Sequence, residues 1–155
     1  MKPLSNEIEL DRFLPYRLSV LANRVSSLIA REYHERFGVT IPEWRIIAML
    51  GGTPELTATE LASRTAMDKV TVSRAVQSLV DREHVTRTAS QSDGRRSHLS
   101  LTASGSRIYH EIAPLALHYE RAITSDLPPA EIQRLHEMMN SLLAGVERVE
   151  SEGLD

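Results

Sequence analysis

The chain has 155 residues, of which 41% are hydrophobic and 25% are charged, as expected for one globular domain with its own core. The sequence shows no apolar run of about 18 residues and no signal-peptide core, so we expect no membrane association and a cytoplasmic location. It contains no cysteine, which excludes disulfides, thiolate metal sites and a thiol-based redox switch.

The net charge of -3 is unevenly distributed along the sequence. Residues 57–102 contain seven Lys or Arg and five Asp or Glu, a net of +2, so the remainder carries -5. The acidic total argues weakly against nucleic-acid binding, but the basic excess in one segment is compatible with it.

The first predicted helix occupies most of the N-terminal third. Pro15 is tolerated only in a first turn, so the helix should begin close to it and end before Gly38. Apolar residues recur along it at spacings of three and four: Leu14, Leu18, Leu21, Val25 and Leu28.

Three shorter helices are predicted next, and two of them begin with a capping box. Thr40 with Glu43, and Thr57 with Glu60, have the spacing that this motif requires. We expect Gly51-Gly52 to stop the first of these helices and the second to end near Thr65. The third begins after the N-cap Asp68, and its buried stripe is formed by Val72, Val76, Leu79 and Val80.

A β-hairpin and two long helices complete the chain. Short alternating runs flank an Asp93-Gly94 turn between Val85 and Thr102, a pattern typical of a hairpin. Thr102 should cap the following helix, which Pro114 should kink. Pro129 lies near the start of the last helix, which has a strict three-four repeat: Ile132, Leu135, Met139, Leu142, Val146 and Val149.

This order of elements predicts a mainly α fold: a winged helix-turn-helix with long N- and C-terminal dimerisation helices and one small β-hairpin wing. Within one structural domain, residues 40–103 would form the DNA-binding lobe. Residues 1–39 and 104–155 would form a helical dimerisation region, because the last helix has more apolar surface than a small winged domain can cover. Packing of these helices within a single chain remains an alternative.

The helix after Asp68 keeps an exposed polar face once its buried stripe is subtracted. Arginine can pair with guanine, glutamine with adenine, and threonine or valine can pack on a thymine methyl group. A solvated helix face is the alternative. The residues predicted to contact DNA from this helix are Lys69, Val70, Thr71, Ser73, Arg74 and Gln77.

Arg95 and Arg96 lie at the tip of the predicted hairpin. A protruding tip beside a recognition helix can reach the adjacent minor groove, whose negative potential favours an inserted guanidinium. Asp93 can hold a neighbouring arginine in a bidentate pair. The alternative is a solvated turn with a local ion pair.

Two stretches, LTATELASRTAMDKVTVSRAVQSLVDREHVTR and SDGRRSHLSLTASG, resemble the multiple-antibiotic-resistance regulator (MarR) family of winged-helix transcription factors. The resemblance extends over essentially the full chain. It implies that Arg95 is the minor-groove residue with Asp93 as its partner. It also implies a homodimer that binds double-stranded DNA at a pseudo-palindromic operator. The sequence departs from the family pattern at Glu83-His84, where a glycine is commoner.

Members of this family often bind small anionic aromatic molecules between the dimer helices and the DNA-binding lobe. The resemblance therefore implies an effector of this kind, or its coenzyme A thioester, that releases a repressor from DNA. The opening LPYRLSVLANRVSS also resembles the branch of the family that controls aromatic-acid or hydroxycinnamate breakdown.

The first helix contains a stripe of arginines, Arg17, Arg24 and Arg31, spaced seven residues apart beside apolar positions. Arginine suits a carboxylate or phosphate ligand. A solvated face, ion pairs with a partner, and a core role for the aromatic residues remain alternatives. The predicted ligand-binding residues are Arg17, Leu21, Arg24, Leu28, Trp44, Ile47, Tyr109 and Ile112.

We expect neither an enzyme nor a cofactor or bound metal. His110-Glu111 and His136-Glu137 do not continue to the second histidine of a zinc-protease helix, and Ser104-Gly105 lacks the context of a nucleophile elbow. Two alternatives to the ligand-responsive regulator remain. One is a metal-responsive winged-helix regulator that uses histidines and carboxylates, and the other is a winged-helix module that binds proteins instead of DNA.

Overall fold

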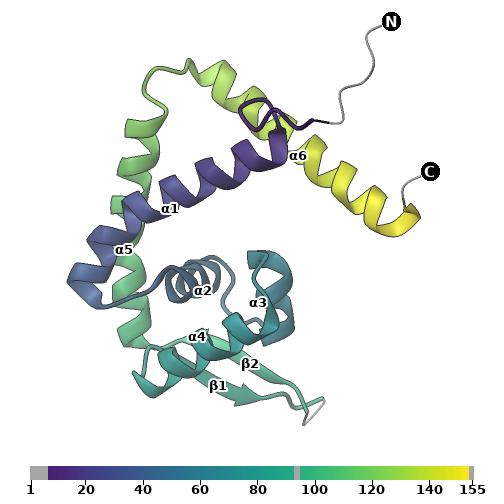
Figure 1. The fold of residues 1–155 in the computed structure, drawn as a ribbon. Helices are drawn as coiled ribbons and strands as arrows, with labels where there is room; N and C mark the ends of the chain where they lie inside the picture. Colours follow the sequence, from purple (N-terminus) through teal and green to yellow (C-terminus); the bar gives the residue numbers. More distant parts are fainter. Residues whose placement is uncertain (1–6, 93–94, 154–155) are drawn as a thin grey trace, which may run out of the picture. The chain divides into compact units, whose positions relative to one another are not determined.

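The computed structural model describes residues 7–92 and 95–153. Over these ranges it is mainly helical with one antiparallel hairpin, which confirms the predicted fold class (Figure 1). Along the chain the elements are α1 (Leu14–Phe37), α2 (Ile41–Gly52), α3 (Ala58–Thr65), α4 (Lys69–Asp81), β1 (Val85–Ala89), β2 (Ser97–Leu101), α5 (Ala103–Ile123) and α6 (Pro129–Glu152).

The chain divides into two compact units, Met1–Ala116 and Leu117–Asp155. The first unit contains α1 to α4, the hairpin and most of α5, and the second contains the end of α5 and α6. Pro114 lies inside α5, which is one helix from Ala103 to Ile123, so a kink at this proline stays a prediction. No helix in the described ranges is both long and apolar enough to span a membrane.

The predicted helix ends agree with the structure at several caps. Pro15 lies in the first turn of α1, and Gly38 ends this helix with a φ of 62°. Both capping boxes are formed: the backbone N–H of Thr40 donates to Glu43 at 2.8 Å, and that of Thr57 donates to Glu60 at 2.8 Å.

The predicted stop at Gly51-Gly52 is confirmed, because α2 ends at Gly52 and Thr53 is its C-cap. The backbone N–H of the C-cap Thr53 donates to the carbonyl of Met49 at 2.9 Å and closes the last turn. At Gly51 a Cβ atom would collide with the ring of Tyr109. This glycine therefore allows the aromatic ring to approach the helix closely.

The core of the first unit forms where α2, α3, α4 and β2 meet. Its fully buried side chains include Ile46, Leu61, Leu79 and Leu99. The predicted stripe of α4 is correct at Val72, Val76 and Leu79. Val80, by contrast, is only partly buried, and Ala75 is buried instead, because residues 72, 75, 76 and 79 form a narrower stripe on a helix of 3.6 residues per turn.

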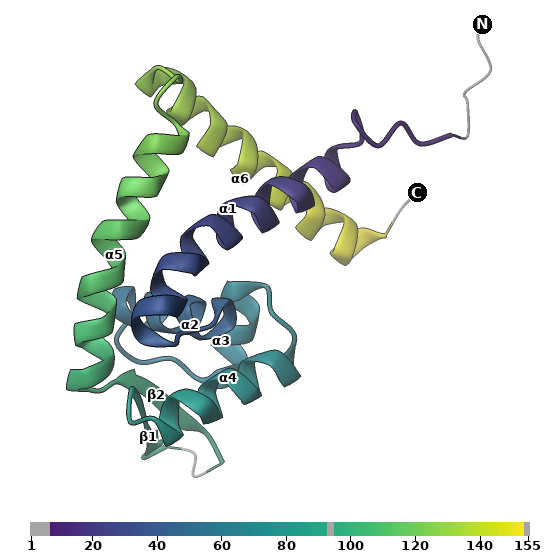
Figure 2. The same cartoon turned by 60° about the vertical axis from the view of Figure 1, so that its left-hand side comes forward.

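The hairpin is joined to the helix-turn-helix by backbone hydrogen bonds. β1 pairs with β2 in antiparallel register from Val85 opposite Leu101 to Ala89 opposite Ser97. Leu56, just before α3, exchanges two backbone hydrogen bonds with Leu99, so it holds the hairpin against this end of α3. The hairpin also lies beside α4 (Figure 2). The predicted Asp93-Gly94 turn lies outside the described residues.

The turn from α4 into β1 contains a backbone conformation that usually favours glycine. Glu83 has a φ of 59°. The backbone N–H of His84 donates to the carbonyl of Leu79 at 2.8 Å and closes the end of the helix. The turn therefore forms with Glu83-His84 at the point where a glycine is commoner in the family pattern.

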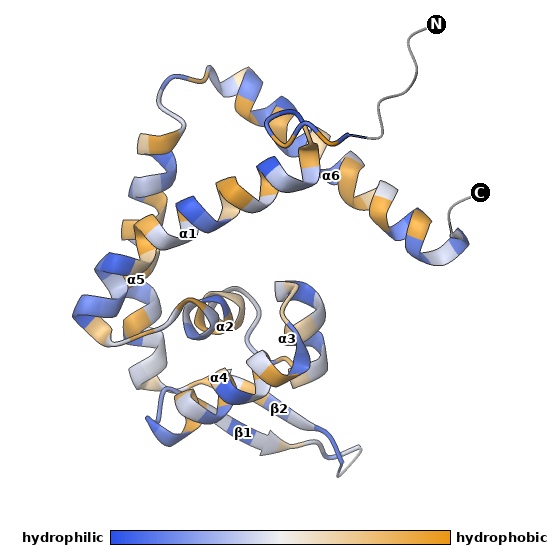
Figure 3. Cartoon of the chain, viewed as in Figure 1, coloured by the Kyte–Doolittle hydropathy of each residue, from blue (hydrophilic) through white to orange (hydrophobic). Residues whose placement is uncertain are grey.

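In the second unit, apolar residues recur along α6 (Figure 3). None of the helix residues is buried within the chain. Ile132 is partly covered. The other five residues of the three-four repeat are between 41% and 54% exposed: Leu135, Met139, Leu142, Val146 and Val149.

Candidate nucleic-acid interface

Asp68 fixes the start of α4, the second helix of the helix-turn-helix. Its carboxylate accepts hydrogen bonds from the backbone N–H of Thr71 at 2.8 Å and from the Thr71 hydroxyl at 2.6 Å. These bonds, first from the hydroxyl and then from the backbone, lower the pKa of the Asp68 carboxyl below its ordinary value. The capped helix thus begins with Lys69 in its first turn and with backbone N–H groups suited to phosphate.

The structure brings the predicted contact residues of α4 together on the side of the helix opposite its buried stripe. Thr71 is partly buried and bonded to Asp68, and Val70 is 59% exposed although it is apolar. An exposed valine next to donors is suited to a thymine methyl group. The remaining predicted residues of this helix are exposed: Lys69, Ser73, Arg74 and Gln77.

A cation that was not predicted lies beside this face. Arg87 of β1 donates to the side-chain oxygen of Gln77 at 3.2 Å, and the Gln77 amide nitrogen donates to Asp81 at 2.7 Å. Arg87 is one of the seven basic residues in segment 57–102. The sequence, however, does not show that pairing of β1 with β2 places Arg87 beside α4.

Arg95 and Arg96 are exposed on the wing. They help to line a hollow of about 490 Å³ between the outer end of the wing and the N-terminus of α3, together with Thr57, Glu60 and His98. The structure thus places both arginines on the same lobe as α4. The predicted pairing of Asp93 with an arginine lies outside the described residues.

The predicted ligand residues divide into three groups. Arg17, Leu21, Arg24 and Leu28 are all exposed along α1. Trp44 and Tyr109 are partly buried and stack with ring centroids 6.3 Å apart. Ile47 and Ile112 have no exposed surface and belong to the core cluster, so a ligand could reach them only by opening the core.

The aromatic cluster extends to a residue that the sequence did not single out. The rings of Tyr33 and Trp44 have centroids 5.9 Å apart, and Tyr33 is only 1% exposed. Burial raises the pKa of the Tyr33 hydroxyl to about 12, although the charge of Arg45 opposes this shift. The cluster therefore lies at the edge of the apolar core near the C-terminal half of α1.

A second hollow of about 470 Å³ is lined by residues of α2, its C-cap and α3, including Trp44, Arg45 and Arg64. In the described residues, no three His, Cys, Asp or Glu side chains lie close enough together to hold a metal ion.

Known proteins resemble this chain in sequence and in fold. Residues 37–96 match the model of the MarR family. The structure of a MarR family transcriptional regulator from Silicibacter pomeroyi DSS is 30% identical, with a TM-score of 0.78 over 88% of this chain and 91% of that one. A MarR/EmrR family regulator from Acinetobacter sp. ADP1 is 25% identical, with a TM-score of 0.84 over 91% and 99% of the two chains.

A third similar fold is that of a MarR family protein from Listeria monocytogenes, which was solved in complex with a 26mer DNA. It is 15% identical and has a TM-score of 0.80 over 90% of this chain and 95% of that one. No curated protein matches the sequence.

Fold and sequence together define a DNA-binding transcriptional regulator of the winged helix-turn-helix class, and not an enzyme. More specifically, the chain belongs to the MarR family.

Proposed function

We propose that the protein is a homodimeric repressor that binds a pseudo-palindromic double-stranded operator and is released by a small anionic aromatic compound or its coenzyme A thioester. The observation that carries the DNA-binding part is the exposed face of α4. Val70, Arg74 and Gln77 share this face, and a hydrogen bond from Arg87 links it to the wing. Such a face supplies one apolar and several hydrogen-bonding contacts to base edges.

The homodimer is supported by apolar surface on both long terminal helices. Leu14, Leu18 and Leu21 of α1 are between 42% and 59% exposed, and five of the six residues of the apolar repeat of α6 are between 41% and 54% exposed. A helix stripe of this length is stable in water when another helix buries it. In this proposal residues 1–39 and 104–155 form the dimer, and residues 40–103 bind DNA.

Arg17 and Arg24 support the choice of an anionic ligand. Both lie on α1 close in sequence to Leu21, which is 59% exposed. A guanidinium beside apolar surface suits a carboxylate carried on an aromatic ring. Trp44 and Tyr109 extend the proposed site with two stacked rings at the edge of the core.

Release of DNA requires only that the ligand binds one state of the dimer more tightly than the other. Two recognition helices must fit successive major grooves, about 34 Å apart. A ligand that favours another spacing by about 1.4 kcal/mol weakens DNA binding tenfold. A shift in the populations of the two dimer states from 1:99 to 99:1 needs a difference in ligand binding of about 5.5 kcal/mol.

The experiment first selects, with the full-length protein, an enriched duplex from a pool of randomised DNA. Release from this duplex is then measured with a panel of aromatic acids, including hydroxycinnamates, and their coenzyme A thioesters. Arg17→Ala and Arg24→Ala should retain DNA affinity and lose the response to whichever compound releases the parent. Arg31→Ala, nearer the end of the same helix, is the matched control. A normal response from both variants would show that the anion site, if any, lies elsewhere.

A further inference from the structure

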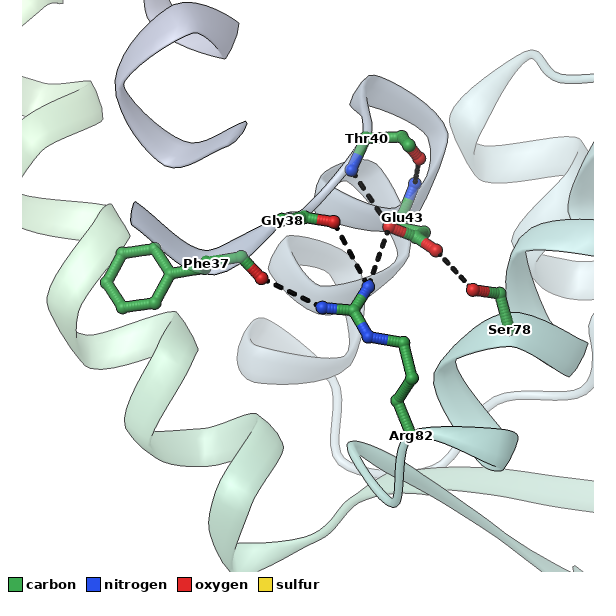
Figure 4. A network of polar contacts seen from close by, with 6 residues as sticks. All are labelled: Phe37, Gly38, Thr40, Glu43, Ser78 and Arg82. Carbon is green, nitrogen blue, oxygen red and sulfur yellow. Dashed lines mark hydrogen bonds and ion pairs between the residues drawn. The ribbon is translucent and has the colours of Figure 1, made fainter. Parts of the chain in front are cut away.

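Arg82 links the end of α4 to the end of α1. It occupies the C-cap position of α4, and its side chain extends toward the junction of α1 and α2 (Figure 4). One terminal nitrogen, Nη2, donates to the carbonyl of Phe37 at 2.8 Å, and the other, Nη1, donates to the carbonyl of Gly38 at 3.1 Å. These carbonyls lie at the C-terminus of α1, where the helix dipole is negative and favours a cation.

Glu43 completes the link from the first turn of α2. Its side chain is 6% exposed, and Oε2 lies 3.4 Å from Nη1 of Arg82. The same oxygen accepts the backbone N–H of Thr40 at 2.8 Å, and Oε1 accepts the hydroxyl of Ser78 at 2.6 Å. The buried carboxylate therefore uses both oxygens, and it joins the N-terminus of α2 to two positions of α4.

We propose that Arg82 and Glu43 are positioning residues for DNA recognition, which hold α4 in a fixed orientation against the α1–α2 junction. This inference rests on the proposed function of α4 in reading base edges. Ser78 and Arg82 are four residues apart and are held by the same carboxylate, so the last turn of α4 is fixed at two points. Arg74 and Gln77 lie within the preceding two turns, so their positions in a groove follow from this attachment.

The link also gives α1 a direct mechanical connection to α4. Gly38 caps α1 in a left-handed conformation, and its carbonyl accepts a hydrogen bond from Arg82. A displacement of the end of α1 must therefore carry the guanidinium with it or break this bond. Coupling of this kind travels through rigid elements joined by hydrogen bonds.

Arg82→Gln is the main test, because the shorter neutral side chain cannot span the distance to both carbonyls and Glu43. Arg12→Gln is the matched control, since Arg12 also pairs with a glutamate, Glu9 at 4.0 Å, but both side chains are at least 75% exposed. Affinity is measured over a range of salt concentrations. The probes are the enriched duplex and a scrambled duplex of the same composition.

Arg82→Gln should weaken binding to the enriched duplex by about tenfold and binding to the scrambled duplex by less than about twofold. The slope of log affinity against log salt should stay the same, because a positioning residue neutralises no phosphate. Arg12→Gln should behave like the parent on both duplexes. A direct phosphate contact by Arg82 would instead weaken both duplexes and lower the slope by about one, which would overturn the proposal.

Ser78→Ala provides a second test if Arg82→Gln does not fold. It removes one hydrogen bond to Glu43 and retains the arginine, and it should weaken binding to the enriched duplex selectively, by about threefold. If the folded variants discriminate between the enriched and the scrambled duplex as well as the parent does, the inference is refuted and the proposed function is unaffected. A parent protein that fails to discriminate between the duplexes would refute the proposed function itself.

Discussion

At the scale of single residues, Gln77 shows how neighbours limit a predicted contact. A glutamine amide reads adenine by donating one N–H and accepting one hydrogen bond. In the structure Asp81 takes one N–H of Gln77 and Arg87 occupies one lone pair of its oxygen. One donor and one acceptor site of the amide remain for a base edge.

Arg74→Ala and Gln77→Ala should each cost about 1–3 kcal/mol of binding to the enriched duplex, because each removes a contact to a base edge. Base preference at the corresponding position should relax. Gel-shift titration on single-base variants of the duplex measures both effects, with Arg36→Ala on α1 as the control. Parental affinity and preference in both variants would refute the assignment of α4 as the recognition helix.

The two wing arginines should differ in their effects. Arg95→Ala should weaken binding and reduce the salt slope by about one, since one guanidinium fewer displaces counterions from DNA. Arg96→Ala should have a smaller effect if its side chain faces solvent in the complex. Salt-titrated binding to one duplex compares them directly. Negligible effects in both variants would leave the wing with a structural role only.

At the scale of elements, local chemistry made most of the helix starts predictable. Thr40, Thr57 and Asp68 each satisfy backbone N–H groups within three residues, so their signals are contained in short stretches of sequence. The end of α2 at Gly52 was also predictable, from the glycine pair Gly51-Gly52. The close approach of the Tyr109 ring to Gly51 was not predictable, because Tyr109 is far away in the sequence.

The cap of α4 provides a pH-dependent prediction. Folding lowers the pKa of the Asp68 carboxyl below its ordinary value of 3.8. The carboxylate therefore stabilises the fold fully when the pH is above this ordinary pKa, and the stabilisation is lost as the pH falls through the lowered pKa. Asp68→Asn keeps a capping oxygen but cannot titrate. It should therefore lose less stability than the parent on acidification, with a small change at neutral pH.

Thermal unfolding of the parent and of Asp68→Asn between pH 7 and pH 2 measures this difference. Asp126→Asn, which changes an exposed aspartate outside α4, is the control. Parallel acid profiles for the parent and Asp68→Asn would contradict the role given to this carboxylate.

At the scale of the whole molecule, the contacts that depend on distant partners were beyond sequence reasoning. Arg82 and Glu43 are 39 residues apart, and nothing in either local sequence indicates that they pair. The same holds for Arg87 and Gln77, whose proximity depends on how the hairpin packs against α4. The exposed face of α4 was predictable, because it is the part of the helix that remains once the buried stripe is subtracted. The spacing of Ile47 and Ile112, by contrast, does not distinguish core residues from pocket residues.

The proposed assembly depends on the uncovered face of α6. Leu135 and Leu142 are 41% and 42% exposed in the single chain, and substitution of either by aspartate would place an unpaired charge in an apolar dimer seam. We expect the parent to sediment as a dimer at micromolar concentration and Leu135→Asp or Leu142→Asp to dissociate. Gln133→Asp, on the same helix, should remain dimeric. A monomeric parent that binds DNA tightly would contradict the assembly.

Sequence-specific recognition of DNA by this protein can be measured by selecting binding sites from randomised duplexes, because selection makes no assumption about the operator. We predict enrichment of a pseudo-palindrome whose two half-sites have centres one helical turn, about 34 Å, apart or a multiple of that distance. Affinity for the enriched duplex should exceed that for a scrambled one and should fall steeply with salt. A pool that shows no enrichment after repeated rounds, with equal binding to all duplexes, would contradict sequence-specific recognition by this protein.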